Sequence, residues 1–126
     1  MQVRFVGPGD LGVPALRGAS ALKVGSHYHV IEIYARRGGS VEYRIEYSID
    51  EIPALFDSRM FKVISSRIPG DWCVTEVGVD LLVFGSGKLR NADFWEAFMD
   101  KEPWTAPLYM EARLSAMDDG ANGTGA

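Results

Sequence analysis

Two histidines are the first candidates for a chemical role in this sequence, as ligands of a metal ion. His27 and His29 are two positions apart in a segment rich in β-branched and aromatic residues. On a strand, side chains at i and i+2 point to the same side, so the two imidazoles could share a metal ion. A metal site needs a third ligand, and no nearby residue has suitable spacing. We therefore predict no metal site, with one histidine solvated and the other packed at the sheet edge.

Cys73 is the second candidate for chemistry. It is the only cysteine, which excludes an internal disulfide and a cysteine-built zinc site. A nucleophilic thiol needs a neighbouring base, and only His27 or His29 could approach it, through the fold. A lone cysteine in an apolar strand is more often a small buried side chain. We predict no catalytic residue.

Gly85-Ser86-Gly87-Lys88 has some likeness to a phosphate-binding loop. That motif requires a longer glycine loop that ends in Gly-Lys-Ser/Thr at the start of a helix, whereas Leu89 follows the lysine here. A tight turn between a strand and a helix explains the segment better. We predict no cofactor.

An acidic surface near the carboxy terminus is the leading candidate for binding. The pattern of residues 93–100 predicts a helix with Asn91 as N-cap, with Phe94, Trp95, Phe98 and Met99 packed against the protein and the remaining side chains on the polar side. A negative stripe beside an exposed aromatic side chain suits a basic protein partner, because charge steers the partner and the aromatic ring anchors it. The predicted partner-binding residues are Asp93, Glu96, Asp100, Glu102 and Trp104.

A basic surface offers an alternative function, namely nucleic-acid binding. Phosphate binding depends on clustered Lys and Arg side chains. The candidates are Arg36 and Arg37 at a predicted hairpin tip, aided by Arg44, Lys88 and Arg90. The overall net charge of −4 argues against a dedicated nucleic-acid binder. A third hypothesis is an enzyme or ligand carrier whose site assembles only in three dimensions.

Aromatic residues could also form a cage for a cation, as barrel folds sometimes do. Aromatic side chains at strand spacing more often belong to a core, which is the interpretation we favour. The residues concerned are Tyr28, Tyr34, Tyr43, Tyr47 and Trp72.

Short strands must position most of these residues. Val41–Tyr47 alternates apolar and charged residues, which predicts a strand with Val41, Tyr43, Ile45 and Tyr47 in the core and Glu42, Arg44 and Glu46 in water. The glycines between it and the preceding segment 28–34 predict a hairpin. Further strands are expected at 61–65, 72–77 and 81–84, and residues 1–6 are expected to add an edge strand.

The spacing of these strands resembles that of an SH3-like barrel. We predict an α+β fold in which about five strands form a small antiparallel barrel or curled sheet, followed by one or two helices. Residues 108–117 alternate as a strand would, but they are rich in helix-forming residue types, and we interpret them as a helix. The chain is expected to form one domain over 1–117, with a disordered tail over 118–126.

Charge is distributed unevenly along the chain. Residues 93–126 contain seven acidic and two basic residues, so the excess negative charge is carboxy-terminal. The longest uninterrupted apolar run, at 81–84, is too short to span a bilayer, and no secretion-type stretch builds up at the amino terminus. We expect a non-enzymatic cytoplasmic protein that binds another, basic protein. In composition it is similar to the immunity proteins and adaptors with which bacteria cap a basic toxin or enzyme.

Overall fold

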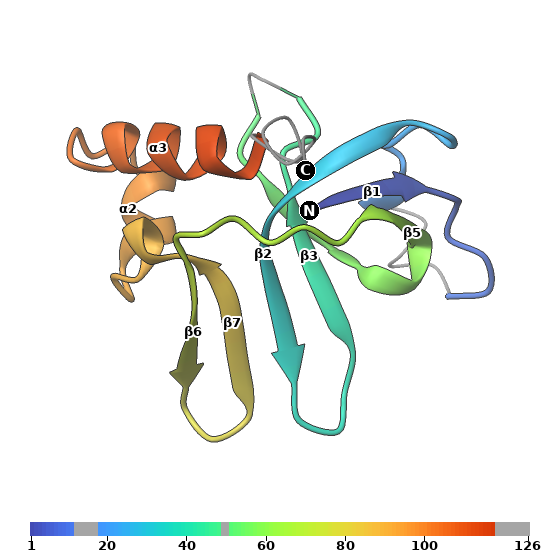
Figure 1. Ribbon diagram of the computed structural model, residues 1–126, viewed down its shortest axis with the longest axis horizontal. Helices are drawn as coiled ribbons and strands as arrows, with labels where there is room; N and C mark the ends of the chain where they lie inside the picture. The colour runs from blue at the N-terminus through green and yellow to red at the C-terminus, as the bar shows by residue number, and fades with distance from the viewer. Residues whose placement is uncertain (12–17, 49–50, 118–126) are drawn as a thin grey trace.

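The chain folds as a mixed α+β structure (Figure 1). The computed structural model describes residues 1–11, 18–48 and 51–117; the tail predicted over 118–126 lies outside these residues. Within these residues, seven antiparallel strands form one sheet, and two α-helices follow the last strand in sequence. The strands are β1 (Gln2–Phe5), β2 (His27–Arg36), β3 (Val41–Ile45), β4 (Ala54–Asp57), β5 (Phe61–Ser65), β6 (Trp72–Val77) and β7 (Leu81–Ser86), and the helices are the 3-10 turns η1 (Ser58–Met60) and η2 (Gly87–Leu89), α2 (Phe94–Met99) and α3 (Thr105–Met117).

Strand β2 organises the sheet because it is long enough to pair with three neighbours. One edge pairs with β3, while the other edge is shared by β1 over the first residues and by β7 over the last. The sheet therefore divides into two wings, with β1 and β5 on one side and β6 and β7 on the other (Figure 1). The terminal strands β4 and β5 do not pair with each other, so the sheet is open.

A first hydrophobic core fills the space between the β1–β5 wing and strands β2 to β4. Val3, Val30 and Ile45 are fully buried in it, as the alternation of apolar residues along these strands requires. The ring of Phe61 packs against three other aromatic rings, those of Phe5, Tyr43 and Phe56.

A second core joins the helices to the opposite face of the sheet. Its buried members are Ile31 of β2, Leu89 of η2, Phe94 of α2, and Tyr109, Ala112 and Ala116 of α3. The three α3 residues recur every three or four positions, which confirms the predicted helix over 108–117 and explains its register. Glu46 holds α3 to the end of β3, because its carboxylate accepts a 2.8 Å hydrogen bond from the Tyr109 hydroxyl and pairs with Arg113 at 2.8 Å.

Several predictions about the strands need correction. The hairpin between β2 and β3 is present, with Gly38 at a φ of 66°. Strand β1, however, lies between β2 and β5 instead of at an edge, and β4 was not predicted. The helices cover the outer face of β3, so Arg44 and Glu46 are largely buried instead of solvated, whereas Val41 is 38% exposed.

Helix α2 also differs in detail from the prediction. Phe94 is completely buried, as expected, but Met99 is 54% exposed and Ala97, expected on the polar side, is buried. The residue that precedes the first turn is Asp93, not Asn91, although the Asn91 side chain accepts a hydrogen bond from the Asp93 backbone N–H. No helix in the described ranges combines the length and apolar character that crossing a membrane requires.

Candidate functional site

A β-bulge in strand β2 creates the most unusual polar site of the protein. The register with β3 shifts between Val30 and Glu32, so Ile31 is the additional residue. Val30 consequently packs into the first core, while Ile31 packs into the second. Glu32 follows on the same face as Ile31, and its side chain is brought beneath the helices instead of into the first core.

Glu32 lies in a row of residues that crosses five strands. Arg44 of β3 pairs with it on one side and Gly85 of β7 on the other. The row continues to Leu55 of β4 beyond Arg44, and to Cys73 of β6 beyond Gly85. Directly paired residues on one face of a sheet interact. The row therefore places the carboxylate of Glu32 between a guanidinium group and a position without a side chain.

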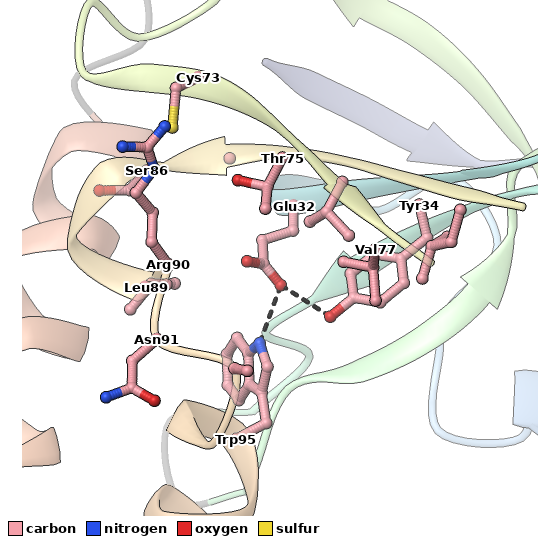
Figure 2. Close-up of a pocket in the computed structure, with 14 residues that line it drawn as sticks. Glu32, Tyr34, Cys73, Thr75, Val77, Ser86, Leu89, Arg90, Asn91 and Trp95 are labelled. Atoms are coloured by element: carbon pink, nitrogen blue, oxygen red, sulfur yellow. Dashed lines mark hydrogen bonds between the residues drawn. The ribbon is translucent and has the colours of Figure 1, made fainter. Parts of the chain in front are cut away.

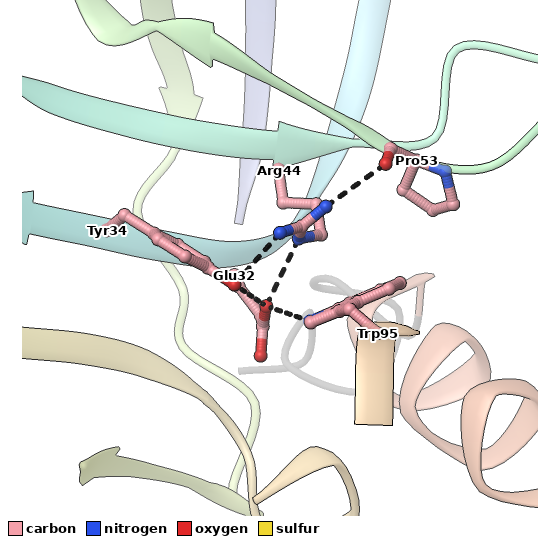
Figure 3. Close-up of polar contacts among 5 residues, drawn as sticks. All are labelled: Glu32, Tyr34, Arg44, Pro53 and Trp95. Atoms are coloured by element: carbon pink, nitrogen blue, oxygen red, sulfur yellow. Dashed lines mark hydrogen bonds and ion pairs between the residues drawn. The ribbon is translucent and has the colours of Figure 1, made fainter. Parts of the chain in front are cut away.

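The guanidinium group of Arg44 is enclosed by aromatic rings and hydrogen-bond acceptors (Figure 3). It lies 4.1 Å from the centre of the Trp95 ring and 5.1 Å from that of Tyr34. Its terminal nitrogens donate to the Tyr34 hydroxyl at 2.9 Å and to the Pro53 carbonyl at 3.2 Å, and its Nε lies 3.3 Å from Glu32 Oε1. Of the aromatic residues considered for a cage, only Tyr34 contacts this cation, and it does so together with Trp95. The other four, Tyr28, Tyr43, Tyr47 and Trp72, belong to or pack against the first core, which is the interpretation favoured from the sequence.

The carboxylate of Glu32 uses one oxygen for all of these contacts. Oε1 accepts hydrogen bonds from the Trp95 indole at 2.9 Å and from the Tyr34 hydroxyl at 3.1 Å (Figure 2). Burial raises the pKa of Glu32 above its ordinary value, although Arg44 and the hydrogen bonds act in the opposite direction. Burial likewise raises the pKa of Tyr34, and the neighbouring Glu32 adds to the effect.

A cavity of about 190 Å³ opens beside this carboxylate. Its lining combines apolar and polar side chains: Glu32, Tyr34, Cys73, Thr75, Val77, Leu81, Val83, Gly85, Ser86, Leu89, Arg90, Asn91, Ala92 and Trp95. The missing side chain of Gly85 is essential to this arrangement, because a Cβ atom there would lie 2.7 Å from Glu32 Cγ. Convergent polar groups around a cavity with a perturbed carboxyl are typical of ligand-binding sites.

The two histidines and the cysteine were the first candidates for chemistry in the sequence, and the structure places each of them. His27 and His29 both pair with β1, and His27 is exposed whereas His29 is partly buried, as expected for one solvated and one packed histidine. Across residues 1–11, 18–48 and 51–117, no group of three His, Cys, Asp or Glu side chains could hold a metal ion. Cys73 is partly buried and lines the cavity beside Glu32.

The predicted partner-binding residues, which together we call the acidic face, are all exposed: Asp93, Glu96, Asp100, Glu102 and Trp104. They lie on the outer side of α2 and in the turn that leads to α3. In the part of the chain that the structure describes, none of the four carboxylates takes part in an ion pair. The Trp104 ring packs edge-on against Phe94 and remains 41% exposed.

A groove adjoins the acidic face at the corner between α2 and α3. This corner groove has a volume of about 300 Å³. Glu51 and Glu102 are exposed at its rim, while Ile52, Phe98 and Met99 contribute apolar surface. Sequence reasoning identified Glu102 here but not the groove, because Glu51 and Ile52 approach the helices only through the fold.

The predicted nucleic-acid residues do not come together. Arg36 and Arg37 are at one end of β2, where Arg36 pairs with Leu81, whereas Lys88 and Arg90 follow the other end of β7, about 17 Å away. Arg36 is paired with Glu42 at 3.2 Å, and Lys88 with Glu111 at 3.4 Å. The side chain of Arg44 is only 13% exposed and is held by Glu32.

Sequence reasoning missed the site around Glu32. Glu32 and Arg44 each occupy an ordinary alternating position, and the pairing of their strands was part of the predicted hairpin. A charged residue within the apolar run 30–33 was the one available signal. Comparisons of this chain with protein-family models, with curated proteins and with solved structures gave no match.

Proposed function

We propose that this protein is a non-enzymatic binding module that captures a basic protein partner through the acidic face and the corner groove. Such a role is similar to that of immunity proteins and adaptors. The observation that carries the proposal is a set of exposed carboxylates on α2 and the following turn, which pair with no described residue and lie beside an apolar groove. Lys101 is the one basic residue from 93 to 104, and it lines the corner groove next to Glu102.

Unpaired charge gives the acidic face its capacity to attract a partner. A carboxylate that is already bound in an ion pair contributes little to the field outside the protein. Asp93, Glu96 and Asp100 are exposed and have no such partner among the described residues, so their field is directed into solvent. Fields of this kind accelerate the association of oppositely charged proteins and select against acidic partners.

The corner groove supports a basic side chain as the element that is recognised. Lysine and arginine carry a long aliphatic chain with a charged end. Phe98 and Met99 supply apolar surface for the aliphatic part, and Glu51 and Glu102 lie at the rim where the charged end would remain. Trp104, which is half-exposed, adds an aromatic anchor of the kind that is frequent at the centre of interfaces.

Charge reversal tests this proposal directly. The variant Asp93→Lys/Glu96→Lys/Asp100→Lys should lose capture of the native partner in cells of origin. With the purified partner, calorimetry should show its affinity reduced by about 100-fold. The matched control is Asp10→Lys/Glu76→Lys/Asp80→Lys, which makes the same change in net charge at exposed positions elsewhere.

The control separates local recognition from overall charge. The control variant should retain the partner, and circular dichroism should show that both variants are folded. Equal loss of capture in both variants would show that the interaction depends only on the net charge of the protein. Full capture by the first variant would show that the acidic face does not bind the partner. A second variant, Glu51→Gln/Glu102→Gln, tests the groove without reversing charge and should weaken binding less than the triple reversal.

A further inference from the structure

The second oxygen of the Glu32 carboxylate is an unused acceptor. Trp95, Tyr34 and Arg44 all approach Oε1, and no described residue donates a hydrogen bond to Oε2. A carboxylate can accept about four hydrogen bonds, so Oε2 retains its full capacity. This oxygen is directed over Gly85, since it lies 3.3 Å from the position that a Cβ atom would take there.

The cavity next to this oxygen has a defined size and chemical character. Its volume of about 190 Å³ leaves room for a small ligand. Val77, Leu81, Val83 and Leu89 make most of its wall apolar, and Figure 2 shows the carboxylate of Glu32 among the lining side chains. A ligand that fits must therefore combine a short apolar body with one group that donates hydrogen bonds.

Charge determines which donor is favoured. An anionic ligand would be repelled by Glu32, and a cationic donor adds a Coulomb attraction to the carboxylate that a neutral donor lacks. Arg44 lies on the far side of Glu32, where Tyr34 and Trp95 enclose it. Arg90 also lines the cavity, but it is exposed and can be screened by solvent.

We propose that this cavity binds a small primary ammonium ion with a short aliphatic body, whose nitrogen donates to Glu32 Oε2. Charge-assisted hydrogen bonds of this type are about twice as strong as neutral ones. The site is separate from the acidic face, and it would exist whether or not that surface binds a partner. It would make the protein a receptor for an amine in addition to its proposed role in protein binding.

The test is a titration followed by nuclear magnetic resonance, with n-butylammonium as the probe. The indole N–H of Trp95 is a specific reporter, because it donates to the same carboxylate. Its resonance should shift and saturate with n-butylammonium, which should bind about tenfold more tightly than n-butanol, while butyrate should not bind. Equal binding of n-butanol, binding of butyrate, or no saturable shift would overturn the proposal.

Two substitutions on β7 locate the binding site and leave Glu32 itself unsubstituted. Val83→Phe places a larger side chain in the cavity, and Leu82→Phe makes a comparable change at the next position, which faces the other side of the sheet and does not line the cavity. Val83→Phe should weaken n-butylammonium by about tenfold or more, while Leu82→Phe should leave it within about twofold. If Val83→Phe folds and binds the probe normally, the ligand is elsewhere. If Val83→Phe does not fold, Thr75→Phe, which fills the cavity from β6, replaces it with the same two outcomes.

Discussion

Gly85 and Glu32 face each other across strands β7 and β2, and the absence of a side chain at Gly85 makes room for the carboxylate. A Cβ atom at Gly85 would lie 2.7 Å from Glu32 Cγ and 3.4 Å from Glu32 Cβ. Neither atom can move easily, because Trp95, Tyr34 and Arg44 hold the end of the side chain. The position of the buried charge and the shape of the cavity therefore depend on one glycine.

The first prediction concerns Gly85→Ala. Replacing glycine in a strand usually lowers the entropy of the unfolded chain and stabilises the protein. Here the added methyl group would displace Glu32 from its contacts, so we expect a loss of about 1–3 kcal/mol in the free energy of unfolding, measured with urea. Gly70→Ala is the control, since nothing lies within 4 Å of its Cβ position, and it should be neutral or stabilising. Equal effects of the two substitutions would show that Glu32 is free to move.

The second prediction concerns the buried ion pair. Arg44→Met leaves Glu32 without its cation and should cost about 3–5 kcal/mol of folding free energy. Glu32→Met/Arg44→Met replaces both charges with apolar side chains, and it should be less destabilised than Arg44→Met alone. Lys88→Met breaks the exposed pair with Glu111 and should change stability by less than about 1 kcal/mol. A double variant that is the least stable of the three would contradict this view of the pair.

The third prediction is a dependence of stability on pH. Burial raises the pKa of Glu32 above 4.5, so the folded state binds this proton more tightly than the unfolded state does. The stabilisation is complete below pH 4.5 and is lost as the pH rises through the pKa of the folded state. The unfolding free energy of the native protein minus that of Glu32→Gln should therefore decrease from about pH 4 upward and then level off. A difference that increases with pH would mean that Arg44 outweighs burial.

Local patterns were sufficient to predict much of the sheet. The strands at 61–65 and 72–77 were predicted with the observed bounds, because turn residues separate them clearly. The hairpin at Gly38 and the helix that contains Tyr109 also agree with the prediction. Strand β4 was missed because its four residues, Ala-Leu-Phe-Asp, show too short an alternation to be recognised.

The site around Glu32 could not be predicted because it depends on long-range relationships. Alternation along β2 would place Val30 and Glu32 on one face, and the bulge at Ile31 reverses this. Arg44 was expected in water because its strand has a regular polar face. That face is covered by α2, whose Trp95 is 63 residues away from Glu32 in the sequence. Contacts between residues so far apart in the sequence do not affect the alternation of apolar and polar residues along a single strand.

The fourth prediction concerns the attachment of α3 to the sheet. Tyr109→Phe removes the hydrogen bond to Glu46 while Arg113 continues to pair with that carboxylate, so the expected loss is about 1.5–3 kcal/mol. Burial raises the pKa of Tyr109 well above its ordinary value of 10.0, and the bond to Glu46 raises it further. The stability difference between the native protein and Tyr109→Phe should thus be constant below pH 10.0 and decrease above it. A difference that does not change up to alkaline unfolding would show that the hydroxyl is exposed to solvent.

The most direct measurement of the proposed function is carbodiimide cross-linking of the protein to its native partner. This reaction joins a carboxylate to a lysine amine only where the two groups touch. We predict that mass spectrometry will find the cross-links at Asp93, Glu96, Asp100 or Glu102, each joined to a lysine of the partner. Cross-links confined to carboxylates elsewhere, such as Glu76 and Asp80 at the far end of the sheet, would contradict the account.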